Sequence, residues 1–563
     1  MPRTSVLIAG AGPTGLALAC DLRRRGIDAQ VVEKLERPPV TTRALGIQPR
    51  GRQILDRLGA LRDLERTARR HQRVAVFVDG KLSAHIDFGS WSGPAEDAPL
   101  LAPQTAIEER LRGRLQELGA AVRWGSAVSD IRQQASGVDV VVQSAEGTRT
   151  IRADWLVGCD GAHSVCRKLI GAEFAGSAYP QTFLAGDVRM AGPRELGPTI
   201  YLRRGQLFVT ALLPDGRWRV GAALRTGDPL AAKGDEGLTA DRDKNSTSAE
   251  EGLARLQELY RDYSGDSATR LIDPTWLSIF RIHRRMASTF RKGRALIAGD
   301  AAHLTSPLGG QGVNTGLNDA FNLGWKLALV IQGRADERLI DTYEAERRPS
   351  VERIDRATAA WTSVLFGDSV GARFVRRWIA LPAMRWRTVQ AWVLTRRGAL
   401  QSSYRGGPLA QDAGTGWLGR ISHRRPQPGD GAPDVECRRR GDSRSTTVGG
   451  EIGPNWGLMI FGPMDEAASA CNAAARERLG GDLVVLHVAS SNQGHETAVD
   501  REIDDPGGKV ARAYRARPGA VILVRPDGHI AWRSPKADRR GLEAWLDRVL
   551  LQRRPADEGA IGP

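Results

Sequence analysis

Three glycines near the start of the chain, Gly10, Gly12 and Gly15, follow a short apolar run that predicts a buried strand. At this spacing the first glycine permits a tight turn and the second lets the backbone approach a pyrophosphate. The third lets the following helix pack against the strand. The free N–H groups and the positive dipole end of that helix would then face phosphate groups. These residues predict a dinucleotide-binding turn.

An acidic residue completes the same pattern. Helical spacing continues to Gly26, and a second apolar run over residues 29–32 ends at Glu33, 18 residues after Gly15. A carboxylate there can accept hydrogen bonds from a ribose diol and would repel a 2′-phosphate, so the tightly bound nucleotide is not expected to be NADP. The residues expected to bind the cofactor in this segment are Gly10, Gly12, Pro13, Thr14, Gly15, Glu33 and Lys34.

Two later apolar runs also end in an aspartate next to a glycine. The first ends at Asp160 and Gly161, and the chain then turns into a short helical pattern that contains Ser164 and Arg167. The second ends at Asp300, and a glycine-rich stretch over residues 307–316 follows it before a long helical pattern that reaches about residue 331.

With GxGxxG, Asp-Gly and Gly-Asp motifs in this order, the chain resembles the class A flavoprotein aromatic hydroxylases of the para-hydroxybenzoate hydroxylase superfamily. The resemblance covers roughly the first 350 residues, and the tail is most similar to the phenol hydroxylase and aromatic polyketide hydroxylase branch. It implies an α/β fold with a Rossmann-like FAD-binding domain, an antiparallel-sheet substrate domain and a C-terminal thioredoxin-like domain.

The same resemblance implies roles for individual residues around non-covalent FAD. Asp300 would hydrogen-bond the ribityl chain, Asp160 would support phosphate handling and NAD(P)H use, and the loop over residues 309–314 would carry the isoalloxazine ring. A glycine-rich loop that opens a long helix would stabilise the negative charge of reduced flavin. The further cofactor-binding residues are Arg43, Gln104, Asp160, Asp300, Pro307, Gly310, Gly312, Val313 and Asn314, and Arg43 and Pro307 are also the candidate catalytic residues.

No metal site is expected. His303 lies near Asp300, but no third ligand accompanies the pair, and the resemblance implies that this position packs the flavin. The five cysteines are scattered and form no CxxC pair, which argues against zinc and disulfides and for a reducing, cytoplasmic compartment.

The sequence pattern divides the chain into five segments. Residues 1–173 form the first part of the FAD-binding domain, 174–285 the substrate-binding sheet, 286–400 the second part of the FAD-binding domain with further helices, 401–455 a connector, and 456–563 a thioredoxin-like domain without CxxC. Within the sheet, Phe208, Leu212 and Trp218 are candidates for substrate contact, and core packing is the alternative that the pattern favours.

Residues 373–397 combine tryptophans with many arginines. A basic amphipathic helix at a membrane is one interpretation. Because Pro382 interrupts the run, helices that pack back onto the flavin domain are favoured instead.

The overall charge is strongly basic, with 81 Lys and Arg against 65 Asp and Glu. The arginines are spread along the chain and no nucleic-acid-binding motif accompanies them, so no nucleic-acid partner is expected. No stretch approaches 18 apolar residues, so neither a membrane span nor a membrane partner is expected. A monomer or a homodimer is expected, and the tail is assigned to packing or dimer contact.

The resemblance implies a flavin monooxygenase. NAD(P)H would reduce FAD, dioxygen would form a C4a-hydroperoxide, and one oxygen atom would pass to an aromatic, phenolic or polyketide-like substrate. The alternatives are a related flavoenzyme that performs Baeyer–Villiger or antibiotic-inactivating oxidation, and a flavin-binding protein without turnover.

Overall fold

The computed structural model contains two compact units, each assembled from segments that lie far apart in the sequence. Unit 1 comprises Met1–Cys20, Ala29–Asn318 and Val351–Leu400, and unit 2 comprises Asp21–Asp28, Asp319–Ser350 and Gln401–Pro563. The residues that the structure describes are 2–39, 45–70, 73–87, 99–192, 197–203, 206–225, 227–231, 246–305, 311–366, 371, 374–383, 386, 403–412, 426–442, 444–489 and 499–550. Within these stretches, no helix is long and apolar enough to span a membrane.

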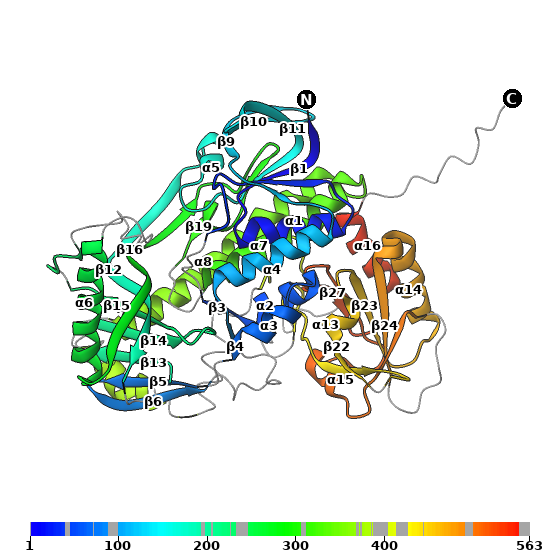
Figure 1. Ribbon diagram of the computed structural model, residues 1–563. Coiled ribbons are helices and arrows are strands. Elements are labelled where there is room, and N and C mark those ends of the chain that lie inside the picture. The colour runs from blue at the N-terminus through cyan, green and yellow to red at the C-terminus, as the bar shows by residue number, and fades with distance from the viewer. Residues whose placement is uncertain are drawn as a thin grey trace. The chain divides into compact units, whose positions relative to one another are not determined.

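Unit 1 contains a mainly parallel sheet (Figure 1). β1 pairs in parallel with β2 and with β11, and β18 pairs in parallel with β11. Val6, Leu7 and Ile8 of β1 are fully buried. The strands in spatial order are β17 (Arg291–Lys292), β18 (Ala295–Ile297), β11 (Gly147–Gly158), β1 (Arg3–Ala9), β2 (Ala29–Val32) and β8 (Val122–Arg123), with β10 (Gly137–Ser144) and β9 (Ala127–Gln134) extending antiparallel from β11. Parallel strands joined by a helix make this the expected Rossmann-like domain.

Helices and a small sheet accompany these strands. α1 (Pro13–Arg24) connects β1 to β2, and it begins directly after the glycine-rich turn. Unit 1 also contains elements that lie outside its two large sheets. Among them are β3 (Gly46–Ile47), α2 (Pro49–Leu58), α3 (Arg62–Thr67), β4 (Arg69–Arg70), β7 (Leu100–Leu101), α4 (Gln104–Glu117) and α5 (Val165–Leu169).

The second sheet of unit 1 is mostly antiparallel and carries α6 (Ser246–Ser264) on one face (Figure 1). Its strands in spatial order are β19 (His303–Leu304), β16 (Arg270–Ala287), β12 (Phe174–Ala191), β15 (Trp218–Ala223), β14 (Gln206–Leu212), β13 (Thr199–Arg203), β5 (Arg73–Val78) and β6 (Lys81–Asp87). Alternate residues of a strand point to opposite faces, and Leu184, Val188 and Phe208 join Leu256 and Tyr260 of α6 in one buried cluster. The sheet therefore has one core face, and its other face is turned away from α6.

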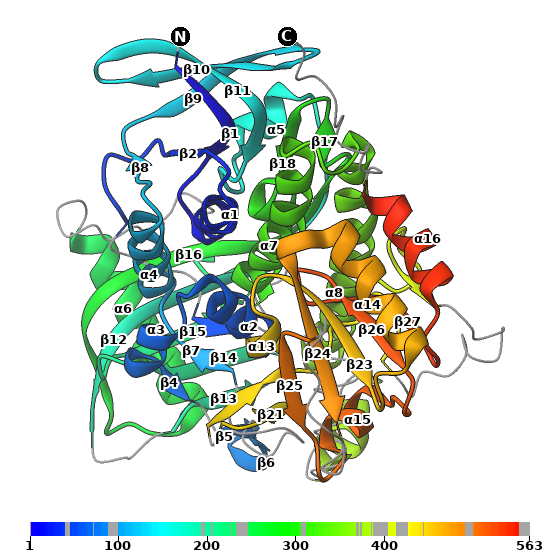
Figure 2. The ribbon, with the colours of Figure 1, turned by 90° about the vertical axis from the view of Figure 1, so that its right-hand side faces the viewer.

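Unit 2 is built around a mixed sheet (Figure 2). Its strands in spatial order are β20 (Gln411–Asp412), β27 (Ile530–Ser534), β26 (Val521–Val524), β23 (Trp456–Phe461), β24 (Leu483–Ala489), β25 (Arg501–Asp504), β21 (Glu436–Arg439) and β22 (Ser445–Thr447). Its helices are α13 (Val448–Ile452), α14 (Glu466–Leu479), α15 (Lys509–Tyr514) and α16 (Arg539–Val549). This is the expected thioredoxin-like domain, but residues 401–455, expected as a connector, supply three short strands to its sheet.

Two long helices follow the last flavin motif in the chain, and parts of both belong to unit 2. α7 (Gln311–Ile331) follows the third motif, and α8 (Asp341–Phe366) comes next. Trp325 of α7 packs edge-on against Trp456 of β23, with ring centroids 5.3 Å apart. This apolar cluster also includes buried residues of α14 and α16, so part of α7 belongs to the core of unit 2.

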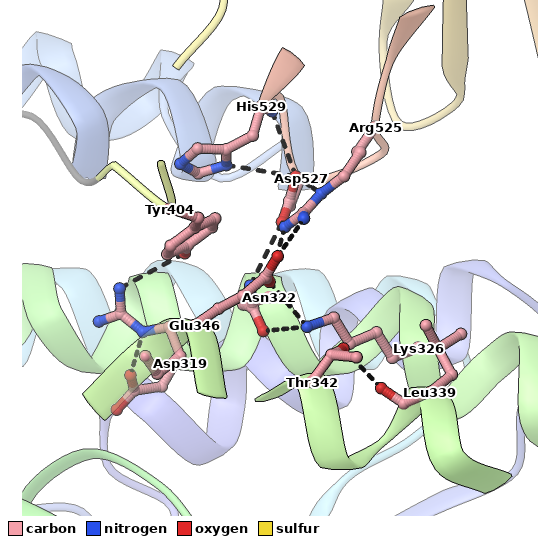
Figure 3. A network of polar contacts seen from close by, with 11 residues as sticks. Asp319, Asn322, Lys326, Leu339, Thr342, Glu346, Tyr404, Arg525, Asp527 and His529 are labelled. Atoms are coloured by element: carbon pink, nitrogen blue, oxygen red, sulfur yellow. Dashed lines mark hydrogen bonds and ion pairs between the residues drawn. The ribbon is translucent and has the colours of Figure 1, made fainter. Parts of the chain in front are cut away.

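A buried polar network inside unit 2 centres on the carboxylate of Glu346 in α8 (Figure 3). Lys326 and Asn322 of α7 donate to Glu346 Oε2, both at 2.8 Å. Arg525, from the turn between β26 and β27, donates to Glu346 Oε1 at 2.5 Å and also pairs with Asp527. All four charged side chains are at most 2% exposed. One carboxylate thus joins three elements without contact with water.

Candidate active site

The three motifs lie at one edge of the parallel sheet because their strands are neighbours. Ala9 of β1 is level with Gly158 of β11, and Gly158 is level with Ile297 of β18. The chain therefore leaves all three strands at their carboxyl ends, where ligands of open α/β sheets bind. Gly10, Asp160 and Asp300 follow these strand ends, as predicted from the apolar run that precedes each of them in the sequence.

The three glycines of the first motif have different surroundings. Gly10 has a φ of 105°, and a Cβ atom there would lie 2.3 Å from the carbonyl oxygen of Cys159. A Cβ atom at Gly15 would lie 2.1 Å from the carbonyl oxygen of Gly10. At Gly12 a Cβ atom would meet no protein atom within 4 Å. The protein itself requires Gly10 and Gly15, whereas Gly12 faces open space of the kind that a pyrophosphate needs.

Glu33 is held at this turn. Its Oε2 accepts a hydrogen bond from the N–H of Ala11 at 2.8 Å, and its Oε1 accepts one from the N–H of Leu35 at 3.1 Å. The carboxylate therefore sits beside the glycine turn, where a ribose diol would reach it. Lys34, the next residue, is exposed to solvent.

Asp160 caps the helix that follows the second motif. The hydroxyl of Ser164 donates to Asp160 Oδ1 at 2.5 Å, and the N–H groups of Val165 and Cys166 donate to Oδ2 at 2.8 and 3.0 Å. These bonds satisfy free N–H groups at the start of α5. They give Asp160 a structural role in the turn, and its direct role toward phosphate and NAD(P)H stays a prediction.

Arg167 joins the second motif to the third, a role that the sequence did not assign to it. Its guanidinium is buried, donates to the carbonyl oxygens of Ala301 at 3.0 Å and Ala162 at 2.9 Å, and lies 3.8 Å from the ring centroid of Phe174. Burial lowers its pKa, although Asp160 opposes this change. Its position six residues after Gly161 was visible in the sequence, but its long-range partner was not.

Asp300 lies in a short turn of 3-10 helix, Gly299–Ala301, and is exposed at the carboxyl edge of the sheet. The turn fits closely against Thr14 of α1. A Cβ atom at Gly299 would lie 2.6 Å from Thr14 Oγ1, and one at Gly316 of α7 would lie 2.1 Å from it. The absence of side chains at both glycines brings α1, the Asp300 turn and α7 together.

Asn314 ties the first turn of α7 to the segment before α2. Its Oδ1 accepts from the N–H of Gln48 at 2.8 Å, and its Nδ2 donates to the carbonyl oxygen of Gly46 at 3.0 Å. Val313 is buried, and a Cβ atom at Gly312 would meet no protein atom within 4 Å. The start of α7 is thus fixed in place with open space in front of it.

Three predicted residues, Arg43, Pro307 and Gly310, lie outside the described residues, so their roles stay predictions. Gln104 begins α4, and its Nε2 donates to Glu108 Oε1 at 2.8 Å. Burial raises the pKa of Glu108, and the negative charge of Glu33 adds to this effect. Gln104 therefore has an acidic partner within the protein, and its contact with FAD is untested.

His303 is buried, and its ring centroid lies 6.0 Å from that of Phe290. Among the described residues, no group of three or more His, Cys, Asp and Glu side chains is arranged to hold a metal ion.

The three candidate substrate residues lie on the α6 side of the antiparallel sheet. Phe208 is fully buried, with ring centroids 5.8 Å from Tyr260 and 5.9 Å from Tyr263 of α6. Leu212 alternates in phase with Phe208 and pairs with Trp218, which packs against the same cluster. Core packing, the favoured alternative, is what the structure shows for Phe208.

The opposite face of this sheet has a different character. Phe183 stacks on Phe280 with ring centroids 5.9 Å apart, and Ala185 and Gly221 lie next to them on the same face.

An ion pair lies on the same face. Arg219 binds Asp187 through two hydrogen bonds of 2.7 and 2.8 Å, and its guanidinium carbon lies 5.0 Å from the ring centroid of Trp276. This face, defined here as the platform face, combines stacked rings, small residues and one buried ion pair. Alternation along residues 183–188 was the signal that would have identified it from the sequence.

Together these features fit FAD. Gly12 leaves space that a pyrophosphate would occupy beside the start of α1, Glu33 lies where a ribose would reach it, and Asp300 and the start of α7 lie at the same sheet edge. The described residues that would hold the cofactor are Gly10, Gly12, Pro13, Thr14, Gly15, Glu33, Asp300, Gly312, Val313 and Asn314.

Comparison with known proteins agrees with this geometry. The chain matches the family model described as FAD binding domain over residues 3–358, and the model described as aromatic-ring hydroxylase, C-terminal, over residues 425–552. The 6-methylpretetramide 4-monooxygenase of Streptomyces rimosus is 30% identical over 570 residues, which cover 99% of this chain and 95% of that protein. Rifampicin monooxygenase of Streptomyces venezuelae is 34% identical over 407 residues, 71% and 79% of the two chains.

A solved structure extends the comparison to the fold. The anhydrotetracycline hydroxylase OxyS from Streptomyces rimosus has a TM-score of 0.74 at 30% identity, and the match covers 97% of this chain and 99% of that one. The expected FAD cofactor and monooxygenase class are thereby confirmed. The chain belongs to the FAD-dependent aromatic-ring hydroxylases, the flavoprotein monooxygenases that insert oxygen into aromatic substrates.

Proposed function

We propose that this hydroxylase uses NAD(P)H as its reductant and acts on a flat, polycyclic phenol of the aromatic polyketide type. The platform face carries this proposal, because stacked rings beside small residues suit a broad aromatic surface. The named relatives, a pretetramide monooxygenase and an anhydrotetracycline hydroxylase, match the chain over almost its whole length and support the same substrate class.

The flavin site positions the cofactor against that substrate. FAD, when bound, carries two electrons from NAD(P)H and activates dioxygen. The glycine turn and Glu33 hold its nucleotide end. The N-terminus of α7 presents free N–H groups and a positive dipole end, which would stabilise negative charge on a reduced ring. Asn314 keeps that helix start beside Gly46 and Gln48.

The ion pair of the platform face would orient the substrate. Arg219 and Asp187 are both 8% exposed and form a bidentate pair, which holds the guanidinium plane in one orientation. A polar pair at one end of an apolar surface distinguishes the oxygenated edge of a phenol from its hydrocarbon edge. The surrounding apolar residues would exclude water from the reacting atoms.

Turnover with labelled dioxygen tests this proposal. The purified holoenzyme, NADH or NADPH and a panel of polycyclic and monocyclic phenols are assayed for substrate-stimulated flavin reduction and for label in the product. The expected product carries one labelled oxygen atom as a ring hydroxyl, with faster flavin reduction for polycyclic phenols. Label within an expanded lactone ring would favour Baeyer–Villiger oxidation. Turnover of rifampicin alone would favour the alternative of an antibiotic-inactivating oxidation, and a rifampicin monooxygenase is among the relatives.

The candidate catalytic residue Arg43 belongs to the same experiment. Arg43→Ala is expected to slow substrate-stimulated reduction more than it lowers FAD content, because the resemblance to the aromatic hydroxylases implies that Arg43 contacts FAD from a mobile loop. Equal losses of FAD and of reduction rate would instead make Arg43 a simple cofactor-binding residue.

A further inference from the structure

An exposed apolar segment of unit 1 has no part in the flavin site. Of the nine large apolar side chains exposed among the described residues, five lie between Phe374 and Trp386. Phe374 is 58% exposed, Trp378 64% and Trp386 69%; Val375 and Ile379 complete the group. We call these five residues the aromatic patch. The sequence favoured helices that pack back onto the flavin domain, and these side chains do not do so.

Four of the five residues lie on a short helical segment, and Trp386 follows it in the sequence. Residues Val375–Ala380 form a turn of π-helix, and α10 (Leu381–Ala383) follows and contacts β6. β6 also exposes Leu82, which is 49% exposed. Soluble proteins rarely expose several large apolar side chains together unless the surface meets a partner.

The charge around the patch indicates the kind of partner. Residues 371–400 contain seven arginines and no aspartate or glutamate. Four of these arginines, Arg376, Arg377, Arg385 and Arg387, are within two residues of Trp378 or Trp386 in the sequence. A segment that is both apolar and rich in arginine suits a partner that is apolar and anionic. Tryptophan and phenylalanine partition to the boundary between lipid headgroups and acyl chains, and arginines beside them attract anionic lipid.

A second copy of the chain is a poorer partner. In a two-fold dimer the same patch meets itself, so the arginine-rich segments of both copies would be brought together. Like charges brought together in this way oppose association. We therefore propose that the aromatic patch is a docking surface for an anionic lipid bilayer, on which the enzyme lies without crossing it.

Vesicle co-sedimentation of the full-length holoenzyme tests this proposal. Vesicles of mixed phosphatidylglycerol and phosphatidylcholine are compared with vesicles of phosphatidylcholine alone, at low and high salt. Binding to the anionic vesicles is expected to be at least about tenfold tighter and to weaken with salt, because salt screens exposed charges over about 8 Å at physiological strength.

The double variant Trp378→Ala/Trp386→Ala separates the patch from the general positive charge of the protein. It should bind anionic vesicles at least about tenfold more weakly, which is the effect of losing the burial of one or two large side chains. Ile272→Ala is the matched control, because Ile272 is 43% exposed on β16, and its binding should not change. Both variants should keep wild-type FAD content and melting temperature.

Three results would overturn the proposal. The first is no binding of the wild type to anionic vesicles, and the second is equal binding of wild type and double variant. The third is a wild-type dimer, measured by light scattering, that the double variant converts to monomer, because the patch would then be an interface between copies.

Discussion

At the scale of single residues, the glycines of the first motif are not equivalent. Gly10 and Gly15 lack side chains because neighbouring backbone atoms occupy that space, whereas Gly12 faces no protein atom within 4 Å. The sequence pattern alone predicted all three as cofactor residues, and the structure separates the two needed for packing from the one that faces open space.

Gly12→Val should therefore fold normally and lose FAD. The added side chain meets no protein atom at Cβ but fills the space that the pyrophosphate needs, so binding should weaken by more than about tenfold. FAD content after gel filtration and the melting temperature of the apoprotein measure the two effects. Gly113→Val is the control, because Gly113 also has open space in α4, and it should retain FAD. Wild-type FAD content in Gly12→Val would contradict the assignment.

Arg167 acts between motifs, and its replacement should weaken FAD binding as well as stability. Arg167→Met removes two donors from the carbonyls of Ala162 and Ala301, which should lower the free energy of unfolding by about 2 kcal/mol. Arg167→Lys should not restore FAD affinity, since one ammonium group cannot reproduce a planar guanidinium with two separate donors.

FAD titration and thermal unfolding check the prediction for Arg167. Arg255→Met provides a comparison, because Arg255 is bound by Asp228 and Glu258 away from the motifs. A full recovery of FAD affinity by lysine would show that only the charge of Arg167 matters.

At the scale of elements, the two faces of the antiparallel sheet have different surroundings. α6 covers the face that contains Phe208, and the platform face carries Ala185 and Gly221. The alternation of side chains along each strand was visible in the sequence. Which of the two alternating sets of residues faces α6 depends on the side of the sheet on which α6 packs. Phe208, Leu212 and Trp218, the candidate substrate residues for which the pattern favoured core packing, lie on the face that forms the core.

Two substitutions distinguish the faces. Phe208→Ala should lower the free energy of unfolding by about 3–5 kcal/mol and leave the KM of the folded fraction nearly unchanged. Gly221→Val should leave the melting temperature nearly unchanged, since its Cβ would meet neighbours at 3.4 Å or more, and should raise KM for a polycyclic phenol about tenfold. Steady-state kinetics and thermal unfolding of both variants provide the check. An unchanged KM for Gly221→Val would remove the platform face from the substrate site.

At the scale of the whole molecule, the division into units does not follow the order of the sequence. Residues Asp319–Ser350 precede the expected connector but belong to unit 2, where Lys326 and Glu346 meet Arg525. Burial alone would raise the pKa of Glu346, but Arg525 and Lys326 hold it at about 2. Burial lowers the pKa of Lys326 to about 8 against the attraction of Glu346.

Acid should weaken unit 2 through Glu346. Because its folded-state pKa is depressed from 4.5 to about 2, Glu346 contributes stability above pH 4.5 that is lost as the pH falls toward 2. The contribution is about 3 kcal/mol. Chemical unfolding curves between pH 7 and pH 2.5 should show this decline, and Glu346→Gln should be less stable at pH 7 with a shallower decline below pH 4.5. Parallel pH profiles for wild type and Glu346→Gln would contradict this account.

Local spacing along the chain predicted a dinucleotide-binding turn, and the resemblance carried by the three motifs, in their order, indicated FAD. Strand, glycine turn, helix and Glu33 are close neighbours along the chain, so local spacing was sufficient to identify them. It also indicated the antiparallel sheet and the domain without CxxC, because alternation and missing cysteines are local properties.

The pairing of residues far apart in the sequence was visible only in the folded chain. Arg167 reaches Ala301 across 134 residues, Asn314 reaches Gln48 across 266, and Arg525 reaches Glu346 across 179. No periodicity along the chain records such a pairing, because a hydrogen bond depends on where the strands and helices bring its two ends. The same reason explains why the face of the sheet that packs on α6, and the exposure of Trp378 and Trp386, became known only from the folded chain.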